Sequence, residues 1–235
     1  MHRYTPRDIL VLVLIAGLFF WSFAQSSRRS LDEFAFFLLA LVLAVSFHEC
    51  AHATVALLLG DTTAKLLGRV SLNPIRHLDL FGSMAFLFIG FGWGKPVPIN
   101  PYNMKGVSPL VGAAISAIAG PVSNVVLAMI AVWVLRLLVG TVGAEPLMVN
   151  FFRELIMINI GLAAFNFLPI PPLDGFSLVR LILPRDVSAW LEQYGMFILI
   201  ALIFIPQFFA PQFDVLRTIM RPIQQAIQTI VFAGL

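Results

Sequence analysis

The chain has 235 residues, of which 60% are hydrophobic and only 11% are charged. About a quarter of the residues of an ordinary soluble domain are charged, so this chain lacks the polar surface that such a domain needs. The formal net charge is +3, but the basic residues are scattered through short connectors, which is typical of a membrane protein and does not indicate nucleic-acid binding. The composition argues against a soluble globular enzyme and predicts a polytopic membrane protein.

The first part of the chain contains two uncharged stretches that are long enough to cross a membrane, residues 9–27 and 34–60. A helix needs about 20 mostly apolar residues to cross the hydrocarbon layer. We interpret residues 9–27 as a retained membrane anchor, since no small-residue cleavage site follows. A polar segment, 61–79, leads to a shorter apolar stretch, 80–94, that is broken by glycines. This stretch is expected to be re-entrant or to form a short β segment.

Three further apolar stretches follow, residues 106–135, 155–168 and 190–209. The first of them is longer than one span requires, and its Gly120-Pro121 pair is expected to kink or divide it. The tail, 213–235, has apolar residues at helical spacing and fits an amphipathic helix at the membrane surface, with a short sixth span as the alternative.

These stretches predict an all-α polytopic membrane protein with about five to six transmembrane helices. We expect a single membrane-embedded domain, 1–235, with its core over residues 34–185. The positive-inside rule predicts which ends of the helices of this domain face the cytoplasm. If the amino terminus is cytoplasmic, most of the basic connector residues also lie on the cytoplasmic side, namely Lys65, Arg69, Arg76, Lys95, Lys105, Arg180 and Arg185.

A metal-binding motif lies inside the second predicted span. His48, Glu49 and His52 form an H-E-x-x-H sequence, and since positions i and i+4 share one face of a helix, both imidazoles can hold one metal ion. Glu49, one step round the helix, can act on a water at the metal without being a ligand. The alternative is a buried polar network that joins helices. Cys50 points to nearly the opposite side of the helix and is interpreted as a packing residue.

A catalytic zinc usually has three protein ligands, so one ligand is expected besides the two histidines. Asp174 is the best candidate, because it follows a predicted span and lies in a proline-stiffened turn. The other carboxylates lie in connectors, beside basic residues or at chain ends. The alternative role for Asp174 is the N-cap of a short helix over residues 176–183.

Three motifs occur in separate spans and in a fixed order: Phe47-His48-Glu49-Cys50-Ala51-His52, Gly120-Pro121-Val122-Ser123-Asn124, and Asn166 through Gly175, which ends in Leu-Asp-Gly. With these motifs, the chain resembles the site-2 protease family of intramembrane zinc metalloproteases, in its compact branch without PDZ or CBS domains. The connector sequences Gly68 to Pro74 and Gly92 to Pro101 also resemble that family. The resemblance covers about residues 34–185.

The resemblance implies that His48, His52 and Asp174 bind Zn²⁺ and that Glu49 is the general base and acid. It also implies that Asn166 helps to hold the substrate or the oxyanion.

Three other polar features have open roles. Asn124 either lines the site as a substrate-binding residue or ties helices together by a hydrogen bond. The segment 65–73 is either an exposed strand edge that pairs with an unwound substrate or an inert connector. His77 is interpreted as a structural residue rather than a fourth ligand.

The expected function is hydrolysis of peptide bonds within or near transmembrane segments of membrane proteins, in regulated intramembrane proteolysis. The expected partners are transmembrane or signal-peptide-like protein substrates and the lipid bilayer. The expected location is a cytoplasmic membrane of bacterial type, with the active site towards the cytoplasm. The alternatives are a metal-binding transporter, a non-catalytic scaffold of the same fold, or a metalloenzyme acting on lipid or prenylated substrates. Glu49 argues against the first two, because neither needs an unliganded carboxylate beside the two histidines.

Overall fold

The computed structural model describes residues 31–79, 82, 94–143, 145–208 and 214–233. The predicted anchor over residues 9–27 and most of the stretch 80–94 lie outside the described residues. The fold below is that of the described part of the chain.

Four described helices are long and apolar enough to cross a membrane. They are α2 (Leu31–Leu58), α5 (Pro109–Val142), α6 (Pro146–Asn166) and α8 (Arg185–Phe208). Their composition explains the helices, since each consists largely of apolar residues whose backbone groups must be satisfied within the segment in a bilayer. The prediction of an all-α polytopic membrane protein is confirmed.

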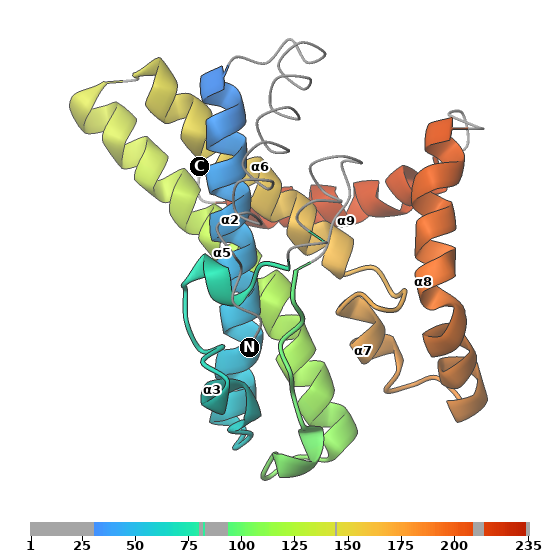
Figure 1. Ribbon diagram of the computed structural model, residues 1–235. Coiled ribbons are helices and arrows are strands. Elements are labelled where there is room, and N and C mark those ends of the chain that lie inside the picture. The colour runs from blue at the N-terminus through green and yellow to red at the C-terminus, as the bar shows by residue number, and fades with distance from the viewer. Residues whose placement is uncertain (1–30, 80–81, 83–93, 144, 209–213, 234–235) are drawn as a thin grey trace, which may run out of the picture.

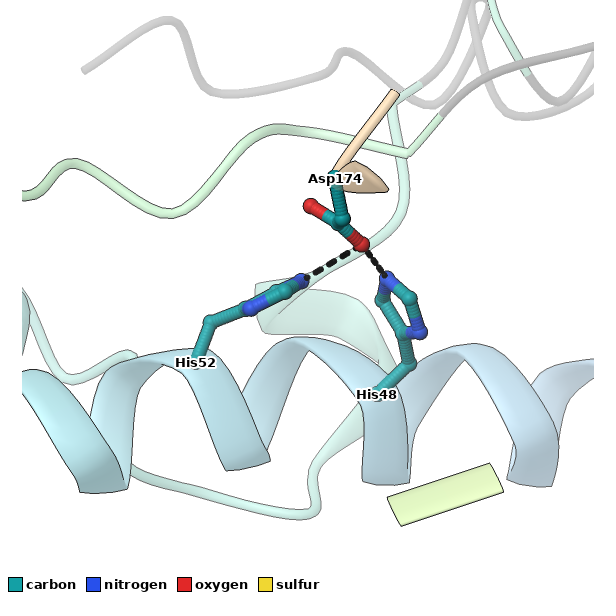
Figure 2. A group of neighbouring side chains, drawn as sticks. All are labelled: His48, His52 and Asp174. Carbon is teal, nitrogen blue, oxygen red and sulfur yellow. Dashed lines mark ion pairs between the residues drawn. The ribbon is translucent and has the colours of Figure 1, made fainter. Parts of the chain in front are cut away.

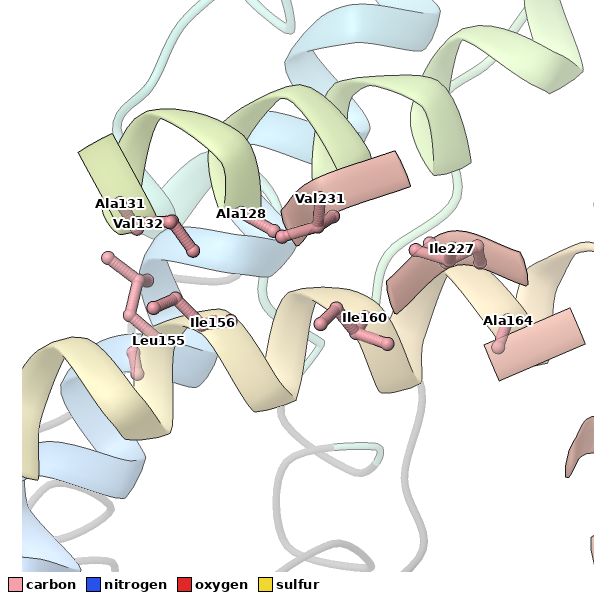
Figure 3. Close-up of a cluster of buried hydrophobic side chains, with 11 residues drawn as sticks. Ala128, Ala131, Val132, Leu155, Ile156, Ile160, Ala164, Ile227 and Val231 are labelled. Atoms are coloured by element: carbon pink, nitrogen blue, oxygen red, sulfur yellow. The ribbon is translucent and has the colours of Figure 1, made fainter. Parts of the chain in front are cut away.

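Helices α2, α5 and α6 pack against one another and form the central bundle (Figure 1). Small side chains line their contacts and allow the backbones to approach closely. Figure 3 shows α5 and α6 facing each other, with two residues of α9 (Val215–Phe232) inserted beside them. The buried cluster comprises Ala40, Ala128, Ala131, Val132, Leu155, Ile156, Ile160, Ala163, Ala164, Ile227 and Val231.

Of the kink or division expected at Gly120-Pro121, the division is wrong, because α5 runs through Pro121 as one helix. A proline in a helix removes one backbone donor, and neighbouring helices and hydroxyl side chains can compensate for this loss in a membrane. Here α5 packs against both α2 and α6.

Short elements connect α2 to α5. They are α3 (Thr63–Leu66) and two 3₁₀ turns, η1 (Pro74–Arg76) and η2 (Pro101–Asn103). Leu78, which precedes the glycine-broken stretch, and Gly94, its last residue, form an isolated antiparallel bridge.

The segment 65–73 begins as a helix end and a turn and not as an extended strand. Its first residues end α3, and Gly68 then reverses the chain with a φ of +68°. Residues 65–68 therefore do not form a regular extended edge, and pairing of the remaining residues with a substrate stays a prediction.

Asp61 fixes this connector to the end of α2. Its buried carboxylate accepts hydrogen bonds from the backbone N–H of Thr63 and of Asn100, at 3.0 and 2.7 Å. The hydroxyl of Thr63 donates to it at 2.5 Å and the amide of Asn103 at 3.1 Å. Burial raises the pKa of Asp61, but these donors outweigh burial and hold the pKa below its ordinary value.

The tail forms α9, an amphipathic helix that begins after Asp214, whose carboxylate accepts from the backbone N–H of Arg217 at 2.8 Å. It is not among the described helices that are long and apolar enough to cross a membrane. In Figure 1, α9 runs across the bundle rather than along it. Ile227 and Val231 anchor it to α5 and α6.

Candidate metal centre

The structure brings His48, His52 and Asp174 together (Figure 2). Asp174 Oδ2 lies 3.1 Å from His48 Nε2 and 3.4 Å from His52 Nε2. One ligand atom from each of the three side chains lies within 4.8 Å of the others. Two parts of the chain that are far apart in sequence therefore meet at one point.

The helical geometry of α2 aligns the two histidines. Residues four apart lie one turn apart on the same face, and the imidazole centroids of His48 and His52 are 4.6 Å apart. Both side chains are buried, with exposed fractions of 6% and 7%.

Asp174 lies in the turn between α6 and α7 (Gly175–Val179). It occupies the N-cap position of α7, but its side chain makes no capping hydrogen bond and faces the histidines instead. The following glycine makes this turn possible, since a methyl group at Gly175 would lie 2.3 Å from the carbonyl oxygen of Phe167. Of the two roles open for Asp174, the geometry favours the ligand role.

The hydrogen bonds of the two imidazoles define which ring nitrogens carry protons. His52 Nδ1 lies 2.8 Å from the carbonyl oxygen of Ser116, which can only accept, so this nitrogen is the donor. His48 Nδ1 lies 2.7 Å from Asn124 Oδ1. The Asn124 amide nitrogen donates to the carbonyl oxygen of Ala44 at 3.0 Å, which leaves Oδ1 to accept from His48.

Because Nδ1 is protonated in each neutral ring, the Nε2 lone pairs of His48 and His52 both face Asp174 Oδ2. That oxygen is buried and has no hydrogen-bond donor. Three acceptor atoms thus converge without a proton between them, which is unfavourable unless a cation lies there. Two imidazole nitrogens and one carboxylate oxygen are the ligand types of catalytic zinc sites, so the residues fit the metal.

Gly120 of α5 closes the other side of the site. A methyl group at this position would lie 2.4 Å from His52 Nε2 and 2.6 Å from His48 Cε1. Only a residue without a side chain lets α5 approach the two imidazoles this closely.

Glu49 lies beside the ligands and is partly buried. The backbone of Gly94 passes next to it, since a methyl group at Gly94 would lie 3.5 Å from Glu49 Oε1. The buried Arg69 holds this segment by donating to the carbonyl oxygens of Arg76 and Lys95. These bonds therefore hold the connector in place next to the carboxylate of Glu49, the predicted general base.

The other predicted residues lie outside the ligand group. Asn166 is the last residue of α6, and its amide donates to the carbonyl oxygen of Leu162 at 3.0 Å. His77 is buried, and its Nε2 bonds the carbonyl oxygen of Ser71 at 2.6 Å. Cys50 contacts Thr54 Oγ1 at 3.8 Å, in keeping with a packing residue.

Sequence reasoning missed Asn159, which is fully buried on α6 and accepts a hydrogen bond from Asn124. An amide inside an apolar span is a signal that could have identified it, because such groups need partners in a membrane.

Comparison with known proteins agrees with this chemistry. The family model of peptidase family M50 matches residues 143–206. YwhC of Bacillus subtilis, named as a predicted zinc metalloprotease, is 39% identical over 180 residues, which cover 73% of this chain and 81% of YwhC.

More distant relatives carry the same type of name. Rip2 of Mycolicibacterium smegmatis is 27% identical over 223 residues, or 87% of this chain and 82% of Rip2. MJ0611 of Methanocaldococcus jannaschii is 29% identical over 182 residues, or 77% of this chain and 87% of MJ0611. No solved structure matches the chain significantly.

The apolar helices, the family match and the similarity to YwhC define a membrane-embedded zinc metalloprotease. The chain belongs to peptidase family M50, the site-2 protease family.

Proposed function

We propose that this enzyme cleaves membrane proteins within or near their transmembrane segments. The observation that supports this most directly is the location of the candidate site. His48 and His52 lie within α2, an apolar helix long enough to cross a membrane, and Asp174 follows a second such helix, α6. A peptide bond that reaches these residues must come close to the hydrocarbon layer or enter it.

We assign the roles as follows. His48, His52 and Asp174 hold the zinc ion, which when bound polarises the substrate carbonyl and lowers the pKa of water to about 7. Glu49 accepts the proton of the attacking water and returns a proton to the leaving nitrogen. Asn166, at the end of α6, holds the substrate or the oxyanion.

The orientation follows from the basic connectors. The end of α2 and the start of α5 are joined by the hydrogen bond from Lys105 N to the carbonyl oxygen of Leu59, at 2.7 Å. Figure 1 shows α3, the start of α5 and the start of α8 towards the same end of the molecule. By the positive-inside rule, this end faces the cytoplasm, in a bacterial-type cytoplasmic membrane.

The proposed substrates are transmembrane or signal-peptide-like proteins. Carbonyl groups inside a transmembrane helix are hydrogen-bonded, so the substrate must unwind locally before water can attack it. The site must therefore receive both an unwound segment and water.

The test compares the wild-type enzyme with Glu49→Gln, reconstituted in liposomes with candidate single-span substrates. Candidates come from comparing the membrane proteomes of cells that carry each form, since uncut substrates should accumulate with the variant. Mass spectrometry locates the cut. We expect cuts within or next to the span by the wild-type enzyme and almost none by the variant, which keeps its zinc.

Cleavage by Glu49→Gln within about threefold of wild type would contradict the general-base role and favour a transporter or scaffold. Cuts confined to soluble regions far from any span would contradict the intramembrane function.

A further inference from the structure

Two fully buried amides connect α6 to the metal centre. Asn159 of α6 and Asn124 of α5 each have an exposed fraction of 0%. Asn124 Nδ2 lies 2.7 Å from Asn159 Oδ1, and Asn124 Oδ1 lies 2.7 Å from His48 Nδ1. A chain of side chains thus runs across three helices and ends on a predicted zinc ligand.

The partners of the two amides determine the direction of each hydrogen bond in this row of side chains. Asn159 Nδ2 donates to the carbonyl oxygen of Leu155 at 2.8 Å, which turns its Oδ1 towards Asn124. Asn124 uses one amide hydrogen for this oxygen and the other for the carbonyl oxygen of Ala44. Backbone carbonyls can only accept, so neither amide can be reversed without losing bonds.

Asn124 Oδ1 therefore always faces His48 as an acceptor. An acceptor at this place requires the proton of His48 to be on Nδ1, which leaves the Nε2 lone pair free towards Asp174. If the Asn124 amide turned over, its NH₂ group would face His48 and favour the opposite tautomer, whose Nε2 carries a proton and cannot bind a metal.

We propose that Asn159 is a positioning residue for zinc binding, which acts through Asn124 to keep His48 in its metal-binding tautomer. The proposal rests on the assignment of His48 as a zinc ligand. It gives α6 a role at the histidine side of the site in addition to leading into the turn that carries Asp174. Outer residues that orient a metal-bound histidine typically change metal affinity by about 10- to 100-fold when replaced.

The test is a double-mutant cycle on zinc affinity, measured by chelator competition on the purified full chain. Asn124→Leu should weaken binding by about 10- to 100-fold. Asn159→Leu should weaken it by roughly three- to tenfold, because the Ala44 carbonyl still holds Asn124. The double variant should bind zinc as Asn124→Leu does, within about twofold, since Asn159 acts only through Asn124.

A matched control removes a buried polar side chain elsewhere. Ser188 of α8 is 6% exposed and does not belong to this chain of amides, so Ser188→Ala should leave zinc affinity within about twofold. If a leucine variant does not purify in folded form, alanine at the same position takes its place in the cycle.

A second measurement reads the tautomer directly. Nitrogen-15 NMR of labelled histidines in the zinc-free protein should show His48 protonated on Nδ1 in the wild type and a mixture of tautomers in the Asn159 variant. A uniform Nδ1 tautomer in that variant would overturn the proposal.

Independent losses that add in the double variant would also overturn it, because Asn159 would then act by another route. The failure of the ligand assignment looks different. If His48 is not a zinc ligand, His48→Ala will keep its zinc. If His48→Ala loses its zinc but Asn124→Leu binds zinc like wild type, only the proposed role of the amides is contradicted.

Discussion

The α-carbon of Gly120 on α5 lies against the imidazole of His52 on α2. A methyl group added to it would lie 2.4 Å from both Cε1 and Nε2 of that ring. Nonbonded carbon and nitrogen atoms do not approach to this distance, so the helices reach their observed spacing only with glycine at position 120. The same residue that permits close packing thereby places the imidazole nitrogens of the proposed zinc ligands.

Gly120→Ala should therefore displace the imidazoles and weaken zinc binding by at least about tenfold, with a matching loss of cleavage. Gly140→Ala is the control, because it lies in the same helix and has nothing within 4 Å of an added methyl group. Alanine there should keep zinc and activity. Equal zinc affinity in the two variants, measured by chelator competition, would contradict the packing explanation.

Purified protein should contain about one zinc per chain, as two imidazoles and one carboxylate predict. His48→Ala, His52→Ala and Asp174→Ala should each remove most of it, as measured by elemental analysis of folded protein. Cys50→Ala should keep its zinc, since this thiol lies outside the ligand group. Full zinc in Asp174→Ala would point to another third ligand.

The grouping of the three proposed ligands could be predicted because its signals are local. An i, i+4 histidine pair lies on one face wherever the helix is placed, and an aspartate after a proline-stiffened turn stands out in an apolar chain. The structure places His48, His52 and Asp174 together, as the sequence indicated.

Contacts between helices could not be predicted in the same way. Asn159 matters because one face of α6 meets Asn124 of α5, and the sequence of α6 alone does not determine which face that is. Of the kink or division expected at Pro121, the division was wrong for a similar reason, since α5 continues through the proline while it packs against both α2 and α6.

Cleavage should depend on how easily the substrate helix unwinds near the depth of His48 and His52. Gly or Pro placed near the scissile bond, but not at it, should raise the rate, whereas a run of Leu or Ala should lower it. In a soluble helix interior, Pro costs about 3 kcal/mol and Gly about 1 kcal/mol relative to Ala. The measurement is a substrate series in liposomes, and rates that do not change with helicity would contradict the unwinding step.

Asp61→Asn should destabilise the connector in a pH-dependent way. The folded-state pKa of Asp61 is below its ordinary value, so its carboxylate contributes stability that is complete above the unfolded pKa of about 3.9. This contribution is lost as the pH falls through the lower folded pKa. At pH 7 the variant should melt several degrees lower than wild type, and the two melting curves should converge in strong acid. A difference that is constant with pH would exclude the charge as its origin.

Because His48 and His52 lie on α2 and Asp174 comes only after α6, biosynthesis delivers the proposed ligands at different times. A nascent chain that has inserted α2 and α5 carries two of the three side chains and cannot complete the metal site. The three side chains can therefore meet only after the turn that follows α6 has been synthesised.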